Sequence, residues 1–258
     1  MKTSDTTTTI RTGLPNPVWL DPRTNGPRGR SNGGFVAGML AELAGGTATV
    51  RLLESVPLDA PLTVRRSRYD RYTLSDGRRA LATAVGVNPF TEVPPVIPTM
   101  DEALAARDAH PFHGVRHLLS DCVVCGPDRA DGLHVTPGPL DSDPSVLATP
   151  FVPHERDTIS GVVTPSTVWG ALDCPSYPAA ALLRGRLCLL GSITAHRHRD
   201  IELGEELIVV GWTRSEGNRS RHTSSALIDG DGRVVASARA VWVELRHQIL
   251  AKLIARWS

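Results

Sequence analysis

Apolar positions along the first third of the chain predict one buried helix followed by strands. The run 35–43 is apolar on nearly every side, which is typical of a helix enclosed in a core. Asn32 is a suitable N-cap for it, and Gly45-Gly46 ends it. Strand-like segments follow at 48–55, 61–66, 69–74 and 80–87. The Asp76-Gly77 pair between the last two indicates a hairpin.

The second half of the chain repeats this order. Thr164 as N-cap with Pro165 at the first helical position starts a second helix, with the apolar run 168–172 behind it. Thr164 follows Phe151 by 13 residues, as Asn32 follows Trp19 by 13. The segment 202–209 echoes 57–64, and Asp231-Gly232-Arg233 echoes Asp76-Gly77-Arg78 before a last strand at 234–245.

This repeat predicts an α+β protein made by duplication, in which each unit is a long helix wrapped by an antiparallel sheet. We expect a disordered tail at 1–13, an N-terminal unit at 14–90, a linker at 91–117 with a helical turn at 101–108, and a C-terminal unit at 118–248. The two sheets can then join into one.

Composition narrows the possible partners. The chain has 28 basic and 27 acidic residues and a net charge of +1, which argues against nucleic acid or an anionic membrane as a partner. The polar, Thr-rich start has no apolar segment of a secretory signal, and four cysteines make no disulfide framework. We therefore expect a reduced, cytoplasmic protein.

Three stretches together carry a resemblance to a known family. They are Asn32-Gly33-Gly34 before the first helix, Cys122-Val-Val-Cys125-Gly with Gly132-Leu133, and the segment 168–175; the ending 231–236 is also typical. They resemble, in turn, the His-Gly-Gly helix start (with Asn in place of His), an opening found in single-unit relatives, and the acid-bearing helix of the hotdog-fold acyl-CoA thioesterases in their double-hotdog form. The resemblance implies hydrolysis of an acyl-CoA thioester without a metal or other cofactor, and possible association into a homo-oligomer.

The resemblance also implies a division of roles at the helix start. Backbone N–H groups and the helix dipole polarise the thioester carbonyl, and a carboxylate seven residues after the second Gly acts as base or nucleophile. In the second unit Thr164 and Ser166 stand in the Gly-Gly region, and the acid is Asp173. The alternative for Asp173 is a structural hydrogen bond at a helix end. Pro165, which has no N–H, removes one donor from this start.

The first unit keeps the complementary part. Gly33 and Gly34 retain the amide donors beside Asn32, but Ala41 stands at the acid position. Glu42 is one residue away and turned by about 100° around the helix, so a structural or solvent-facing role competes with a catalytic one. This pattern fits two diverged sites with one retained, and it fits a lost activity equally well.

Cysteine and arginine clusters offer further candidates. Cys122 and Cys125 with His110, His113 and His117 upstream suggest half a zinc site, but no second Cys pair follows, so we expect no metal. Cys174 is interpreted as a core cysteine. The arginines around the turn at 217–218 suit a CoA phosphate, or are exposed hairpin residues: Arg214, Arg219 and Arg221.

Three functions remain open from the sequence. The first is an acyl-CoA thioesterase, and the second is a non-catalytic hotdog protein that binds an acyl group or acyl-CoA. A dehydratase or hydratase of the same fold is third, because no acid–His pair about five residues apart occurs at either helix.

Overall fold

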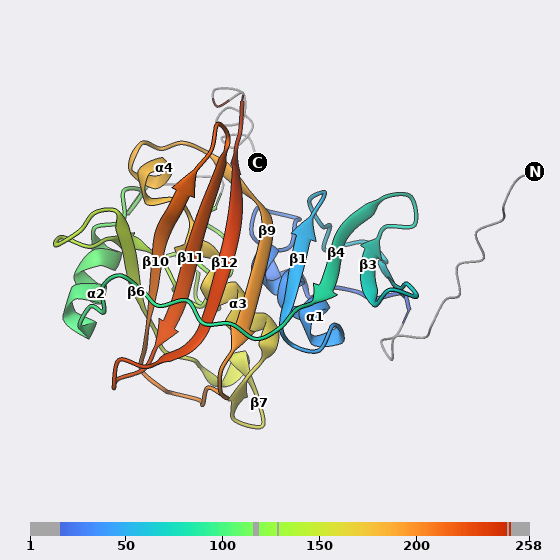
Figure 1. Ribbon diagram of the computed structural model, residues 1–258, viewed down its shortest axis with the longest axis horizontal. Coiled ribbons are helices and arrows are strands. Elements are labelled where there is room, and N and C mark those ends of the chain that lie inside the picture. The colour runs from blue at the N-terminus through green and yellow to red at the C-terminus, as the bar shows by residue number, and fades with distance from the viewer. Residues whose placement is uncertain (1–15, 116–118, 128, 247, 249–258) are drawn as a thin grey trace, which may run out of the picture.

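The computed structural model describes residues 16–115, 119–127, 129–246 and 248. Its centre is one ten-stranded antiparallel sheet, in the order β2-β3-β4-β1-β9-β12-β11-β10-β6-β5, with two buried helices against one face (Figure 1). The predicted α+β architecture is therefore confirmed. The tail at 1–13 lies outside the described residues.

The first half supplies one helix and four strands. Helix α1 begins after Asn32, whose side-chain oxygen accepts from the N–H of Phe35, as predicted from its N-cap position. Positive φ angles at Gly45 and Gly46 end the helix region. The elements are α1 (Gly33–Leu43), β1 (Ala48–Leu52), β2 (Thr63–Arg66), β3 (Arg71–Ser75) and β4 (Ala80–Gly86).

The second half supplies the larger part of the sheet. Helix α3 begins at the predicted Thr164 cap, whose hydroxyl accepts from the N–H of Thr167. The main elements of this half are β5 (Gly138–Pro139), β6 (Val146–Phe151), α3 (Pro165–Asp173), α4 (Ala179–Leu183), β9 (Cys188–Arg197), β10 (Leu207–Glu216), β11 (Ser220–Ile228) and β12 (Val234–Glu244), and helix α2 (Met100–Asp108) lies in the segment between the two halves. A small hairpin, β7 (Thr158–Ile159) with β8 (Val162–Val163), precedes α3, and short 3-10 turns lie at Pro22–Thr24, Glu155–Asp157 and Cys174–Ser176.

The two halves join through β1 and β9. These strands pair antiparallel from Ala48↔Ala195 to Arg51↔Ser192, and the hydroxyls of Thr49 and Thr194 hydrogen-bond across the joint at 2.9 Å. The sheet therefore runs without a break from one half into the other.

Helices α1 and α3 lie side by side in opposite directions, in contact through glycine. A Cβ on Gly34 would lie 2.6 Å from the carbonyl oxygen of Trp169, and one on Gly38 would lie 2.5 Å from the Cα of Ser166. Gly170 in turn leaves room for the ring of Phe35. The start of α1 is thus brought against the end of α3, which decides where the functional groups meet.

A strap made of residues 88–99 crosses the sheet face opposite α3 (Figure 1). Glu92 anchors it: its N–H donates to Ser237 Oγ, and its carboxylate accepts from Ser224 Oγ and pairs with Arg239. The adjacent Ser225 points to the other face, where its hydroxyl donates to the carbonyl of Leu172 in α3.

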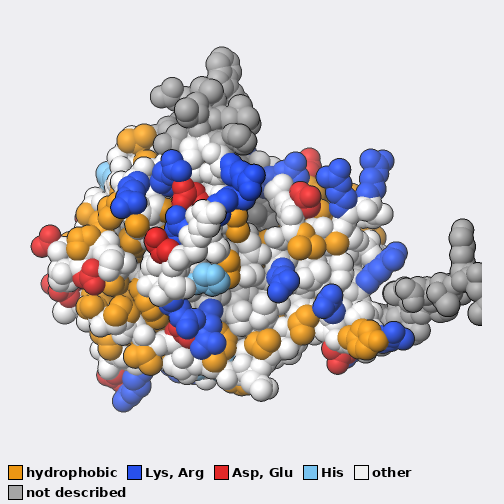
Figure 2. Space-filling model, turned by 45° about the horizontal axis from the view of Figure 1, so that its top comes forward, with side chains coloured by type: hydrophobic (Ala, Val, Ile, Leu, Met, Phe, Trp, Pro, Cys, Tyr) orange, Lys and Arg blue, Asp and Glu red, His pale blue; other side chains and the backbone are white. Residues whose placement is uncertain are grey.

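The surface carries charges of both signs. On the face shown in Figure 2, basic side chains are spread among acidic and apolar ones, in keeping with the net charge of +1. Across the described residues, no helix is long and apolar enough to cross a membrane.

Candidate active site

Asp173 and Gly34 form the centre of the site, one from each half of the chain. The backbone N–H of Gly34, in the first turn of α1, donates to Oδ2 of Asp173 at 2.9 Å. Asp173 is the last residue of α3 and is 3% exposed. Its other oxygen, Oδ1, is buried and has no hydrogen-bond partner in the described part of the chain. Buried polar atoms without a partner are rare in folded proteins, and a catalytic role is one explanation for them.

Burial of Asp173 and the nearby start of α1 shift the pKa of its carboxyl in opposite directions. Desolvation raises the pKa of Asp173 to about 7, while the Gly34 N–H and the Asn32 side chain act in the opposite direction. A carboxylate is unfavourable at the end of its own helix and favourable at the start of another. Because α1 and α3 are antiparallel, the positive end of α1 faces the negative end of α3 at this residue.

Asn32 connects the helix start to a loop from the second half, residues 119–127, here called the Cys loop. Its side-chain nitrogen donates to Sγ of Cys122 at 3.7 Å, and the residue is buried. The loop is fixed to the first half because Val123 N–H donates to the carbonyl of Asn25 at 2.8 Å, and the Asn25 amide donates to the carbonyl of Asp121 at 2.7 Å. The Cys loop therefore lies directly over the start of α1.

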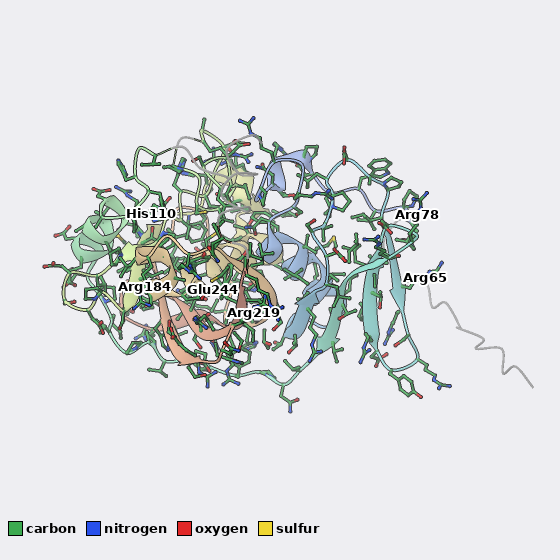
Figure 3. The ribbon with its side chains drawn as sticks, turned by 90° about the horizontal axis from the view of Figure 1, so that it is seen from above. Arg65, Arg78, His110, Arg184, Arg219 and Glu244 are labelled. Atoms are coloured by element: carbon green, nitrogen blue, oxygen red, sulfur yellow. The ribbon has the colours of Figure 1, made fainter. Side chains whose placement is uncertain are left out.

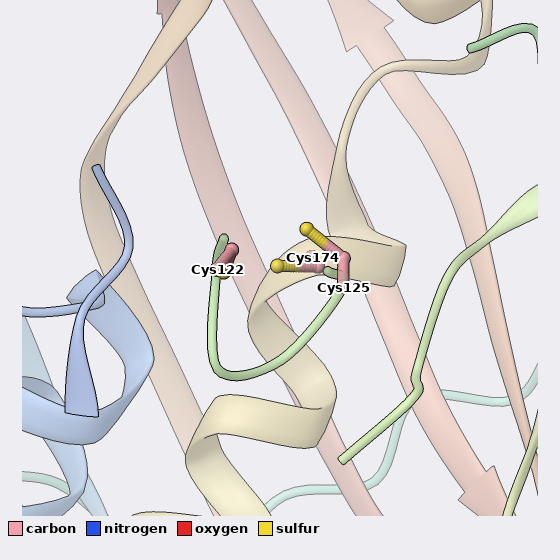
Figure 4. A group of neighbouring side chains, drawn as sticks. All are labelled: Cys122, Cys125 and Cys174. Carbon is pink, nitrogen blue, oxygen red and sulfur yellow. The ribbon is translucent and has the colours of Figure 1, made fainter. Parts of the chain in front are cut away.

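Three cysteines meet beside this carboxylate. The sulfur atoms of Cys122, Cys125 and Cys174 all lie within 4.8 Å of one another (Figure 4). Hydrogen bonds from Cys125 and then Cys174 lower the pKa of Cys122. Neither His110 nor His113 joins the group, and His117 lies outside the described residues. The ring of His110 is instead hydrogen-bonded to the carbonyl of Pro137 at 2.7 Å.

Comparison with solved structures identifies the architecture. A putative thioesterase II from Thermobifida fusca YX has a TM-score of 0.56 and 18% identity, covering 93% of this chain and 96% of its own. The tesB protein of Mycobacterium avium subs paratuberculosis also has a TM-score of 0.56, at 13% identity, covering 84% and 88%. The chain has a double hotdog fold. No family model matches the sequence, and no curated protein does.

Because α1 and α3 are antiparallel, the start of one helix meets the end of the other at both ends of the pair, and we call each such place a helix junction. Asp173 lies at one junction, and the second junction is at the other end of the pair. Thr164 and Ser166 lie there, about 12 Å along α3 from Asp173 at 1.5 Å per residue. The Thr164 hydroxyl is used as the helix cap, and Ser166 packs its backbone against Gly38. Glu42 lies near the end of α1 with an exposed side chain. The structure thus brings Asn32, Gly33, Gly34 and Asp173 together and leaves Glu42, Thr164 and Ser166 at the opposite junction.

Arg219 and Arg221 lie away from both junctions, at the end of the β10–β11 hairpin. The guanidinium of Arg219 donates to the carbonyl of Glu244 at 3.2 and 3.1 Å (Figure 3). Arg221 pairs with the Glu244 carboxylate at 2.8 Å. Arg214 lies 3.7 Å from the carboxylate of Glu92. Arg219 and Arg221 thus donate hydrogen bonds within the protein, whereas Arg214 is half exposed and only loosely paired.

The sequence missed two features of the site. Leu52 and Leu190 approach the start of α1: a Cβ on Gly33 would lie 2.9 Å from one and 3.0 Å from the other, and 3.5 Å from Asp173 Oδ2. Cys174 joins Cys122 and Cys125 from a distant segment. The glycines inside two otherwise apolar helices were the available signal, because they indicate close helix contact.

Proposed function

We propose that the protein hydrolyses an acyl-CoA thioester, with Asp173 as base or nucleophile and the start of α1 as the carbonyl-binding group. The observation that carries this proposal is the Asp173 carboxylate of one half, with one unpaired oxygen, against the first turn of the helix from the other half.

The carbonyl has a suitable donor. N–H groups in the first turn of a helix have no acceptor within that helix, so the Gly33 N–H is free of the helix ladder. The dipole of α1 adds positive potential at this position. A thioester carbonyl oxygen bound there gains stabilisation as negative charge develops on it.

The carboxylate completes the reaction. Oδ1 of Asp173 accepts a proton from water while the water oxygen bonds to the carbonyl carbon. Collapse of the tetrahedral intermediate breaks the carbon–sulfur bond, and the proton passes from Asp173 to the leaving CoA thiolate. In the nucleophilic variant, Oδ1 attacks the carbon first and CoA leaves as the thiolate. Water then hydrolyses the acyl-aspartyl anhydride to the free acid and the Asp173 carboxylate, and the proton released in this step neutralises the thiolate.

The test is turnover of a panel of acyl-CoA esters by the unmodified protein and by Asp173→Asn. Asn keeps the shape and an acceptor for the Gly34 N–H, so folding is retained while the rate falls by roughly a hundredfold or more. Glu42→Gln is the control, because Glu42 is exposed at the opposite junction, and it leaves the rate unchanged. Full turnover in Asp173→Asn would contradict the assignment.

A non-catalytic acyl-CoA-binding protein is the second candidate. It is favoured by the burial of both Asp173 and Asn32, 3% and 4% exposed, beneath the Cys loop. Binding of a non-hydrolysable acyl-CoA without turnover of any ester in the panel would select it.

A further inference from the structure

We propose that Cys122, Cys125 and Cys174 bind one soft divalent cation of the zinc class. Their sulfurs converge from two segments, the Cys loop and the end of α3, and all lie within 4.8 Å of one another. With a zinc–sulfur bond of about 2.3 Å, two sulfurs on one tetrahedral ion are about 3.8 Å apart. Small side-chain rotations are therefore sufficient to bring the three onto one ion.

The position of Cys122 is fixed by its neighbours. Its sulfur accepts a hydrogen bond from the side-chain amide of Asn32 at 3.7 Å. Gly126 closes this turn: its N–H donates to the carbonyl of Cys122 at 2.8 Å, and a Cβ there would lie 2.5 Å from that oxygen. The loop thus holds the first ligand before any ion arrives.

Ion binding at this site is coupled to the release of thiol protons. Cys125 and Cys174 are half-buried, and Cys122 is buried. Binding exchanges up to three thiol protons for one divalent ion, which leaves a net charge of −1 on the three-thiolate site. No His, Asp or Glu in the described chain joins the group, so a fourth ligand comes from solvent or a bound molecule.

The sequence predicted no metal because no second Cys pair follows Cys125. The structure changes that premise, since Cys174 stands 49 residues further on and supplies a third sulfur. Zinc sites with three protein ligands keep one position open. An ion here ties the Cys loop to α3 immediately beside Asp173, and the proposal does not depend on the protein being a hydrolase.

The test is metal binding by the full chain, purified with reductant and chelator and then titrated with Co²⁺. We expect thiolate-to-cobalt charge-transfer absorption that saturates at about one ion per chain and is removed by one equivalent of Zn²⁺. We expect metal affinity to fall by roughly a hundredfold in each of three variants, Cys122→Ser, Cys125→Ser and Cys174→Ser. Loss of a residue that only hydrogen-bonds to a metal ligand already costs up to about a hundredfold, and loss of a ligand itself should cost at least as much. Cys188→Ser is the matched control, because Cys188 is a buried free cysteine outside the group.

A second readout keeps the result clear if a serine variant folds poorly. In the unmodified protein, Zn²⁺ should raise the melting temperature and slow the alkylation of the half-buried Cys125 and Cys174 under native conditions. The proposal is overturned if Co²⁺ gives no charge-transfer absorption, if Zn²⁺ protects no cysteine, or if Cys188→Ser abolishes binding as well. Loss of binding in these assays leaves the hydrolase test with Asp173→Asn unaffected.

Discussion

Gly34 contributes to the structure in two ways. Its N–H donates a hydrogen bond to Asp173, and its lack of a side chain allows α3 to pack closely against α1. A Cβ here would lie 2.6 Å from the Trp169 carbonyl oxygen, 2.7 Å from the Cβ of Asp173 and 2.8 Å from the Cα of Gly170. Two of these neighbours are backbone atoms, which cannot move aside without separating the helices.

We therefore expect Gly34→Ala to lower the free energy of unfolding by about 1–3 kcal/mol, the usual cost of overpacking. It should also lower thioester turnover by displacing the carboxylate. Denaturant unfolding and acyl-CoA turnover measure the two effects. Gly230→Ala is the control, because a Cβ there meets nothing within 4 Å and its φ is not in the left-handed region. Equal stability of the two variants would show that the helices are not so closely packed.

At the scale of elements, Arg129 fastens the Cys loop to the segment before α1. Its guanidinium donates to Asn25 Oδ1 and to the carbonyls of Asp121 and Arg23, and it pairs with Asp131 at 2.7 Å. The side chain is only 11% exposed. Arg233 and Asp231 form a pair of the same spacing in a turn, but there the arginine is 75% exposed.

Arg129→Ala should cost about 1–3 kcal/mol of stability, because several carbonyl and carboxylate acceptors lose their donor. Arg233→Ala should change stability by less than about 1 kcal/mol, as is usual for an exposed pair. Thermal or denaturant unfolding of the two variants makes the comparison. A cost at Arg233 as large as at Arg129 would contradict it.

The Arg129–Asp131 ion pair also predicts that the stability of the fold depends on pH. Arg129 lowers the pKa of Asp131 to about 2, below the usual unfolded value of about 3.9. The folded carboxyl thus binds its proton more weakly, so the pair stabilises the fold above pH 4 and loses this contribution as the pH falls from about 4 to 2. Asp131 is 44% exposed, so the effect is small. Titration of Asp131 by NMR should show its pKa rising toward the ordinary value in Arg129→Ala and staying low in Arg233→Ala.

The role of Glu92 in fixing the strap (residues 88–99) to the sheet can also be tested. In Glu92→Ala, Ser224 loses its acceptor under the strap and Arg239 loses its carboxylate. We expect faster proteolysis within 88–99 and a loss of about 1–3 kcal/mol, the cost of unpaired buried polar groups. Arg214→Ala serves as the control, because Arg214 lies 3.7 Å from Glu92 and is 46% exposed. Unchanged cleavage in Glu92→Ala would show that other contacts hold the strap.

Elements were predictable from sequence where local chemistry decides them. Asn32 and Thr164 cap the two helices, and the Asp76-Gly77 turn joins β3 to β4, as predicted. Sequence spacing, however, assigned Asp173 to the donors of its own unit. The structure pairs it with Gly34, because antiparallel packing of α1 on α3 is a tertiary contact that no local pattern encodes.

At the scale of the whole molecule, the two helix junctions are equivalent positions in the two units, but they carry different functional residues. One has Gly33, Gly34 and Asp173, and the other has Pro165, Ser166 and Ala41. We therefore expect one catalytic site per chain. Calorimetric titration with a non-hydrolysable acyl-CoA analogue should give one ligand per chain in the unmodified protein. Two equal ligands per chain would contradict a single retained site.

The two halves are joined covalently, because they belong to one polypeptide, and the pairing of β1 with β9 joins their sheets. In a ring of identical subunits every substitution is copied by symmetry into each equivalent site, so a change that spoils one site spoils all. A tandem chain is free of that constraint. Ala41 and Asp173 are encoded in one chain but can mutate independently. The junction with Ala41 can therefore change while the junction with Asp173 keeps its carboxylate.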